Sequence, residues 1–349
     1  MRPALLTPAP ATIDTDLLWA LASVLALIAV VSAVTCLCRG AGIARRRAAD
    51  RRWLDACRVS LGAADSTSPL IGASPRRQVF TVVALCRSVT GADKERVVDW
   101  ADQAGLTDRA LRWASSWSWT VRVRGARVLA TLANHPEVLA RMFSDRRPEV
   151  RRQAAEHSSS PLTPEVLSGL LRLLDDHDPG VRFVACDTLA RGGKSSAPYL
   201  AMGLGSPHPR VVGGALRAAM TNLDPALLPG ATALCGSTDP QERAGGVSLL
   251  ALLHAPGTAA AIRFFLNDPD EVVRAAAATG LGRLRDALAA GQVAELLTDP
   301  SWQVRRAAGF ALYRLGAPGT VMLRAALRSQ DPYATDMARL VIAAVEVNP

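Results

Sequence analysis

The chain has 349 residues, of which 49% are apolar and 5% aromatic, and its formal net charge is +9 at pH 7. The apolar content excludes a mainly disordered chain, because it can bury a large core. Few aromatic residues beside abundant alanine, leucine and arginine argue against a β-sandwich and favour closely packed helices.

The positive charge is concentrated rather than spread. Between residues 39 and 58, seven arginines stand against two aspartates, which accounts for over half of the net charge. This local origin argues against an extended nucleic-acid surface. The six cysteines are scattered and have no histidine at ligand spacing, which excludes a disulfide framework and a zinc site. We expect a reducing compartment, no metal and no other cofactor.

Residues 17–38 form a run of 22 residues without a charged side chain. A helix of this length spans roughly 30 Å, the thickness of the hydrocarbon core of a bilayer. The arginines follow the run, which favours an uncleaved anchor over a signal peptide or a lipoprotein. Since positive flanks stay in the cytoplasm, we expect residues 1–16 outside the inner membrane of a bacterial cell and the chain beyond Arg39 inside it.

Residues 39–61 are predicted to form a basic helix that either lies along the membrane surface or continues the membrane helix. Five of its arginines are expected to contact anionic lipid headgroups: Arg45, Arg46, Arg47, Arg51 and Arg52. Trp53 is either an interfacial anchor or an ordinary packing residue. Residues 62–75 are rich in glycine, serine and proline, so we expect a linker there, followed by one domain over residues 76–349.

From residue 121 onward a pattern recurs every 29 to 31 residues. Each copy has a turn, often Asp-Pro, and then an apolar anchor position; the anchors are Val121, Val150, Val181, Val211, Glu242, Val273 and Val304. Arginine follows six of the seven anchors, a small residue stands four positions past each anchor, and leucine usually stands eight past it. Positions 0, 4 and 8 share one face of a helix, which predicts a buried stripe.

One copy of the pattern is a helix, a turn and a second helix, and it cannot bury its apolar face alone. We therefore expect the copies to stack as a helical-repeat domain. Residues 76–104 are expected to cap its N-terminal end. The unit around Thr335 is expected to cap its C-terminal end, because Asp336 stands where the other units have arginine.

Two segments carry a family resemblance: NDPDEVVRAAAATGLGRL at residues 267–284 and TDPSWQVRRAAGFALYRL at residues 298–315. They resemble the HEAT-repeat family, in particular its short bacterial form described as phycobilin-lyase-like. The resemblance implies a right-handed α-solenoid of HEAT-like helix pairs. Together with the uncharged run at residues 17–38, it leads us to expect an all-α protein in which a single N-terminal transmembrane helix precedes the solenoid. It also implies that partners bind on the concave side, which the second helices line.

The arginines fall into two sets with different expected roles. The first set follows the anchors and is predicted to bridge aspartates between adjacent repeats, with phosphate binding as the alternative. We name it the arginine ladder: Arg122, Arg151, Arg182, Arg243, Arg274 and Arg305.

The second set belongs to the exposed face, at positions 2, 6 and 10 past the anchors. An aromatic residue among arginines is typical of a binding hot spot, although a merely solvated face is the alternative. The predicted partner-binding residues are Arg217, Arg283, Arg306, Phe310 and Arg314.

Trp113, Trp117 and Trp119 are expected to cover the open end of the solenoid, with a membrane or protein contact as the alternative.

No catalytic motif is present, so we expect a scaffold or adaptor and not an enzyme. Its partner is expected to be a membrane-bound protein such as a glycosyltransferase or another envelope-assembly enzyme. The alternatives are a nucleic-acid-binding HEAT-like protein and a bilin-lyase-like enzyme.

Overall fold

The computed structural model describes residues 32, 44, 47–62, 68–132, 135–156 and 162–347. Regular structure within these ranges is helical throughout, without a strand, which confirms the all-α prediction. The chain divides into two compact units, Met1–Trp100 and Ala101–Pro349.

The expected transmembrane helix at residues 17–38 and the segment before it lie outside the described residues, apart from Ser32. Among the helices that the structure does describe, none combines the length and the apolar character needed to cross a bilayer.

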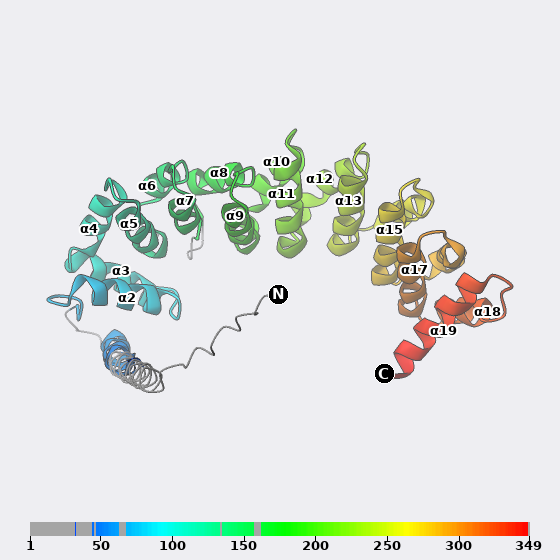
Figure 1. The fold of residues 1–349 in the computed structure, drawn as a ribbon, viewed down its shortest axis with the longest axis horizontal. Helices are drawn as coiled ribbons and strands as arrows, with labels where there is room; N and C mark the ends of the chain where they lie inside the picture. Colours follow the sequence, from blue (N-terminus) through cyan, green and yellow to red (C-terminus); the bar gives the residue numbers. More distant parts are fainter. Residues whose placement is uncertain are drawn as a thin grey trace, which may run out of the picture. The chain divides into compact units, whose positions relative to one another are not determined.

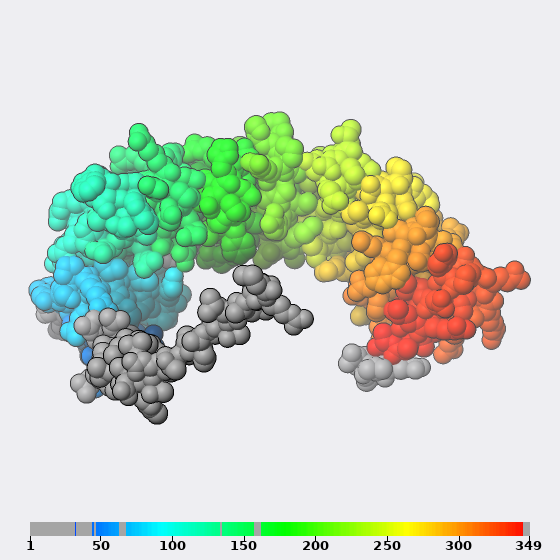
Figure 2. Space-filling model, in the orientation of Figure 1, coloured from blue at the N-terminus to red at the C-terminus, as the bar shows by residue number. Residues whose placement is uncertain are grey.

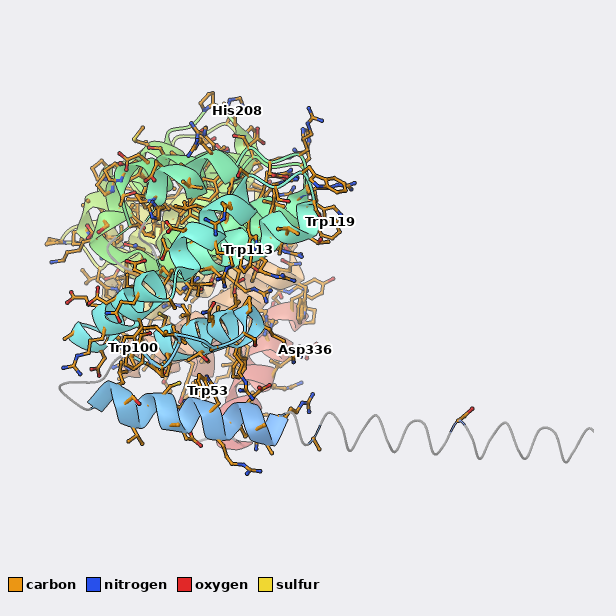
Figure 3. All side chains as sticks on the ribbon, turned by 90° about the vertical axis from the view of Figure 1, so that its left-hand side faces the viewer. Trp53, Trp100, Trp113, Trp119, His208 and Asp336 are labelled. Atoms are coloured by element: carbon orange, nitrogen blue, oxygen red, sulfur yellow. The ribbon has the colours of Figure 1, made fainter. Side chains whose placement is uncertain are left out.

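The first unit contains a helix over residues 47–62, then α2 (Pro75–Cys86) and most of α3 (Ala92–Gln103). Cys57 and Leu61 on the first of these helices are buried. Trp53 points from that helix toward α2 and donates a hydrogen bond from Nε1 to Thr81 Oγ1 at 2.9 Å (Figure 3). Arg77 of α2 lies 5.3 Å from the centre of the Trp53 ring. Trp53 is therefore a packing residue of this unit.

Residues 68–74 belong to the same unit and are packed rather than open. Leu70 is fully buried, and its carbonyl oxygen accepts a hydrogen bond from Gln78 Nε2 at 3.0 Å. Ser68 Oγ donates to the carbonyl oxygen of Trp100 at 3.1 Å. The linker expected at residues 62–75 is therefore wrong for this stretch, because one leucine and two side-chain hydrogen bonds outweigh its loop-like composition. The compact unit also reaches past residue 76, where the single domain was expected to begin.

The second unit is a stack of helix pairs. The first helices of the pairs are α4 (Leu106–Ala114), α6 (Pro136–Met142), α8 (Pro164–Leu173), α10 (Ala197–Leu204), α12 (Leu228–Leu234), α14 (Thr258–Arg263), α16 (Ala290–Glu295) and α18 (Ala317–Ala326). The second helices are α5 (Trp119–Leu132), α7 (Pro148–Ala155), α9 (Pro179–Arg191), α11 (Pro209–Asn222), α13 (Pro240–Leu253), α15 (Glu271–Leu284), α17 (Trp302–Arg314) and α19 (Pro332–Val347). Short 3-10 turns are η1 (Gly193–Ser195), η2 (Pro225–Leu227), η3 (Phe264–Asn267), η4 (Ala287–Ala289) and η5 (Leu296–Thr298).

Each second helix packs on the next, from α5 on α7 to α17 on α19, and each first helix packs on the second helix of its own pair. Within this unit the stack follows an arc with the second helices on its inner side (Figure 1). Side chains fill the spaces between successive helices (Figure 2). The unit is therefore an α-solenoid.

The predicted stripe forms the core of the solenoid. Every small residue four positions past an anchor is buried, and Ala154, Ala185 and Ala277 are fully so. Gly246 shows why the position must be small, because a Cβ there would lie 2.8 Å from the carbonyl oxygen of Ala231 on α12. The small residue thus lets the two helices of a pair approach until their backbones touch.

The aspartates of the Asp-Pro turns stand at two different distances from their anchors, which the sequence pattern did not distinguish. Asp178 and Asp239 stand three residues before their anchors and cap α9 and α13, each accepting a backbone N–H with its carboxylate. Asp268 and Asp299 stand five residues before theirs and accept the N–H two residues further on, at 2.9 and 2.8 Å. Only the aspartates five residues before an anchor face the preceding repeat.

The last unit is also shifted by one residue from its expected register. Thr335 is only partly buried, whereas Ala334 and Ala338 are buried against the preceding pair. Ala334 is therefore the anchor of the C-terminal unit.

Candidate functional site

Trp302, Arg306, Phe310 and Arg314 form a row on the exposed face of α17, because residues four apart lie on one side of a helix. The guanidinium of Arg306 lies 5.7 Å from the centre of the Trp302 ring and 5.6 Å from that of Phe310. Both distances are within the range of cation–π attraction. Arg306 is therefore held between two aromatic rings.

This row is one wall of a groove of about 730 Å³ across three second helices, which we call the α17 groove. Its lining residues are Ser248 of α13, Ala275, Ala276 and Thr279 of α15, and Trp302, Gln303, Arg306, Ala307, Phe310 and Arg314 of α17. The space exists because α15 presents alanines where α17 presents aromatic and arginine side chains. All of the lining residues belong to the second helices α13, α15 and α17, which lie on the inner side of the arc (Figure 1).

Two close contacts fix the walls of the groove. Near the end of α15, a Cβ on Gly282 would lie 2.7 Å from the Cα of Ala311 on α17, so the two backbones touch there. At the turn end, Arg274 of α15 is ion-paired with Asp299 just before α17 at 2.8 Å. The spacing of the helices is therefore set by the fold before any ligand binds.

The groove is positively charged. Arg306 and Arg314 are the charged residues in its lining, and within the described ranges neither is paired with a carboxylate. Both side chains are exposed. The arrangement suits a ligand that brings its own negative charge and some apolar surface.

Three of the five predicted partner-binding residues meet in this groove, namely Arg306, Phe310 and Arg314. Arg283 on α15 and Arg217 on α11 are exposed but do not line it. Trp302, 53% exposed, is the residue that the sequence analysis missed. It stands two residues before an anchor, outside the positions taken as the exposed face, although its spacing of four from Arg306 was a usable signal.

The arginine ladder is a set of bridges between repeats at four of its six positions. The paired atoms lie 2.6 Å apart in Arg122–Asp145, 2.6 Å in Arg151–Asp176, 3.0 Å in Arg243–Asp268 and 2.8 Å in Arg274–Asp299. In each pair the same guanidinium also donates to at least one backbone carbonyl of its own turn, as Arg274 does to Asp268 and Pro269. These arginines have a structural role.

Arg182 and Arg305 depart from that pattern. Arg182 donates to the carbonyls of Asp176 and His177, but serine stands at position 206, where the other ladder arginines meet an aspartate. Arg305 lies 4.4 Å from the centre of the Tyr333 ring instead of bridging. Val212 replaces the arginine altogether in α11, so the ladder is interrupted on both sides of that helix.

The ladder holds its aspartates ionised. Burial alone would raise the pKa of Asp299, but hydrogen bonds from Arg274 and the Ser301 N–H, with the charges of Arg274 and Arg305, outweigh it and lower that pKa. The same opposition lowers the pKa of Asp145, Asp176 and Asp268. The bridges are therefore fully charged at neutral pH.

The tryptophan cluster does not form a cover. Trp117 is 95% exposed in the turn before α5, so the expected capping role is wrong for it. Trp119 is partly exposed near Arg147, and Trp113 is half-buried beneath Arg124 (Figure 3).

The membrane-interface arginines are described only in part. Arg47, Arg51 and Arg52 are exposed on the helix of residues 47–62, whereas Arg45 and Arg46 lie outside the described residues.

Among the described residues, no three metal-ligating side chains come together. Burial raises the pKa of Cys86 and Cys235 to about 11, so these thiols stay protonated at neutral pH.

Comparison with known proteins gives the class. Residues 136–221 and 225–312 match the profile of HEAT repeats. A chain in a structure of Kap95p binding to RanGDP aligns at 12% identity and a TM-score of 0.50, covering 77% of this chain and 44% of its own length. An engineered protein aligns at 17% identity over 84% of this chain and 99% of its own, with a TM-score of 0.34. No curated protein matches the chain. The protein is thus an α-solenoid that carries HEAT repeats.

Proposed function

We propose that the protein is a scaffold that binds another protein through the α17 groove. The observation that carries this proposal is the Trp302–Arg306–Phe310 row, with the arginine held between the two rings. Tryptophan and arginine are enriched among the residues that dominate binding energy. Because the groove walls are fixed by the fold, binding loses little conformational entropy. The structure of Kap95p binding to RanGDP offers a precedent for a similar solenoid in a protein complex.

The proposal includes a membrane anchor. The uncharged run at residues 17–38 and the exposed Arg47, Arg51 and Arg52 support a single-pass anchor in a bacterial inner membrane, with the solenoid on the cytoplasmic side. Anchoring raises the effective concentration of the scaffold for a membrane-bound partner. A glycosyltransferase or another envelope-assembly enzyme is such a partner.

The same proposal gives the protein no catalytic activity. The polar groups that line the groove are Ser248, Thr279, Gln303 and two arginines, a set without a carboxylate, imidazole or thiol for acid–base or nucleophilic work in this described site. The narrower resemblance to phycobilin-lyase-like repeats remains a prediction. It would be supported by a spectral change on mixing the protein with a bilin.

The test uses the full-length protein in its native membrane. Crosslinking, affinity capture and mass spectrometry are compared for the wild type and for a triple variant with alanine at Arg306, Phe310 and Arg314. A matched control carries Arg324→Ala and Arg328→Ala, which remove two exposed arginines outside the groove. We expect one membrane protein that the triple variant loses and the control keeps. Equal recovery in all three proteins would contradict the proposal.

The anchor has a separate test. The wild type is expected to stay in the membrane pellet after an alkaline carbonate wash, and a variant with arginines at three sites within residues 17–38 is expected to be released. Release of the wild type would contradict the membrane anchor without bearing on the proposed role of the groove.

A further inference from the structure

We infer that the α17 groove binds an acidic polypeptide segment whose carboxylates pair with Arg306 and Arg314. This inference rests on the proposed function and names the chemistry of the partner.

The first step is a contrast between two kinds of arginine in neighbouring positions. Arg305 of the ladder donates to the carbonyls of Asp299 and Pro300 and is 9% exposed. Arg306, the next residue, makes no hydrogen bond within the described ranges and is exposed, with only the two aromatic rings against it. Its guanidinium N–H groups are therefore available, and the fold itself does not use them.

The second step is the cost of covering such a group. A guanidinium removed from water without an acceptor loses its hydration, so a stable occupant must supply oxygen atoms to it. Stacking uses the faces of the guanidinium and leaves its edge for a bidentate contact, which a carboxylate matches. The ring centres of Trp302 and Phe310 lie 5.7 and 5.6 Å from the guanidinium carbon of Arg306, within the range of cation–π attraction.

The third step separates a polypeptide from a nucleic acid. Nucleic-acid grooves present a run of cations along the phosphate backbone. This groove contributes two arginines, and further along the inner row Asp187 of α9 is paired with Arg191 at 2.9 Å. The rest of the lining is small or uncharged, with Ala275, Ala276 and Ala307 beside Ser248, Thr279 and Gln303. Such a wall leaves room for small side chains between two acids.

The spacing of the arginines sets the spacing of the acids. Arg306 and Arg314 are eight residues apart on α17, which corresponds to roughly 12 Å along the helix. An extended chain covers this distance in about four residues. The expected ligand therefore has acidic residues at positions i and i+4 with small apolar residues between them.

The test measures fluorescence anisotropy with full-length protein in detergent and three probes of similar length. One probe is a peptide with glutamate at every fourth position and glycine, alanine and glycine between, because glycine disfavours the helix and keeps the peptide extended. The second has glutamine in place of glutamate, and the third is a single-stranded oligodeoxynucleotide. We expect the glutamate peptide to bind about tenfold or more tightly than the glutamine peptide. Its binding should weaken as salt is raised.

Variants then locate the binding. Arg306→Ala and Arg314→Ala should each weaken the glutamate peptide about tenfold, and Arg306→Lys should restore only part of the loss, since lysine lacks the planar fork. Arg324→Ala on α18, an exposed arginine that does not line the groove, is the matched control and should bind as the wild type does. Thermal unfolding of every variant checks that the fold is intact.

Equal binding of the glutamate and glutamine peptides overturns the inference, as does oligonucleotide binding that is tighter and is lost in the same two variants. These results are separable from the fate of the scaffold itself. If the triple variant loses its crosslinked membrane protein while the glutamate and glutamine peptides bind equally, the scaffold proposal is supported and the acidic ligand is contradicted. If the peptide binds as expected but no protein is captured, the proposed function falls.

Discussion

Arg274 and Asp299 join two successive repeats through a bridge of 2.8 Å between Nε and Oδ2. The same guanidinium donates to the carbonyl oxygen of Asp268 in its own turn at 2.9 Å, and the same carboxylate accepts the Ser301 N–H at 2.8 Å. The two side chains are 15% and 6% exposed. One pair thus ties together a turn, the next turn and the wall of the α17 groove.

Removing one partner of this bridge is expected to destabilise the solenoid. Arg274→Ala leaves Asp299 mostly buried without its counter-charge, which should lower the free energy of unfolding by about 2–3 kcal/mol. Arg283→Ala on the same helix, exposed and outside the bridge, should change it by less than about 0.5 kcal/mol. Urea denaturation followed by circular dichroism measures both variants. Equal midpoints for the two would show that the bridge contributes nothing.

The bridges also predict how stability depends on pH. The folded-state pKa of Asp299 is lowered, so its contribution is present above the unfolded pKa of about 3.9 and is lost as the pH falls through the folded value. Stability should therefore decrease on acidification below about pH 4. Urea midpoints measured between neutral pH and pH 3 check this. Asp299→Asn should be less stable at neutral pH and should show a flatter acid limb; an unchanged limb would contradict the assignment.

A missing bridge can be supplied. Ser206 accepts the His208 N–H at 3.2 Å, as the ladder aspartates accept theirs, and Arg182 already donates to its own turn. Ser206→Asp should therefore pair with Arg182 and stabilise the protein by about 1 kcal/mol. A double-mutant cycle with Arg182→Ala measures the coupling. No coupling energy would mean that the repeats on either side of this interface are spaced differently from the bridged ones.

Substitution by alanine should change stability in opposite directions at two helical glycines, Gly246 and Gly213. Gly246→Ala places a methyl group against the backbone of α12 and should destabilise by about 1–3 kcal/mol. Gly213→Ala, in α11 with no atom of the described structure within 4 Å of the new methyl group, should stabilise by about 0.5–1 kcal/mol. Thermal unfolding distinguishes them, and the same sign for both variants would contradict the close approach at Gly246.

Much of the solenoid could be predicted because its repeat consists of packing residues that recur at fixed positions. A valine, a small residue and a leucine at one helical face can be recognised without knowing the fold, and Val273, Ala277 and Leu281 are fully buried as that pattern requires. The bridging of the ladder could be inferred from charge, but not which aspartate takes part. Asp178 and Asp268 look alike in sequence, yet the first caps its own helix and the second reaches the preceding repeat.

The candidate site was harder to predict. Arg306, Phe310 and Arg314 could be placed on one face by their spacing, whereas Trp302 lies before the anchor and its contribution depends on where α17 begins. The groove also depends on Ala275 and Ala276 of a different helix, whose small size matters only once α15 and α17 are packed. Leu70 escaped prediction for the same reason, since its burial depends on contacts distant in sequence.

Site-specific photocrosslinking in the native membrane tests the central claim most directly. A benzoylphenylalanine replaces Phe310 in the α17 groove or, as the matched control, Phe264, which is 83% exposed on η3 beside the row of first helices. We predict an adduct with one membrane protein from position 310 and none from position 264. Adducts of equal yield from both positions, or none from position 310, would contradict a scaffold that acts through this groove.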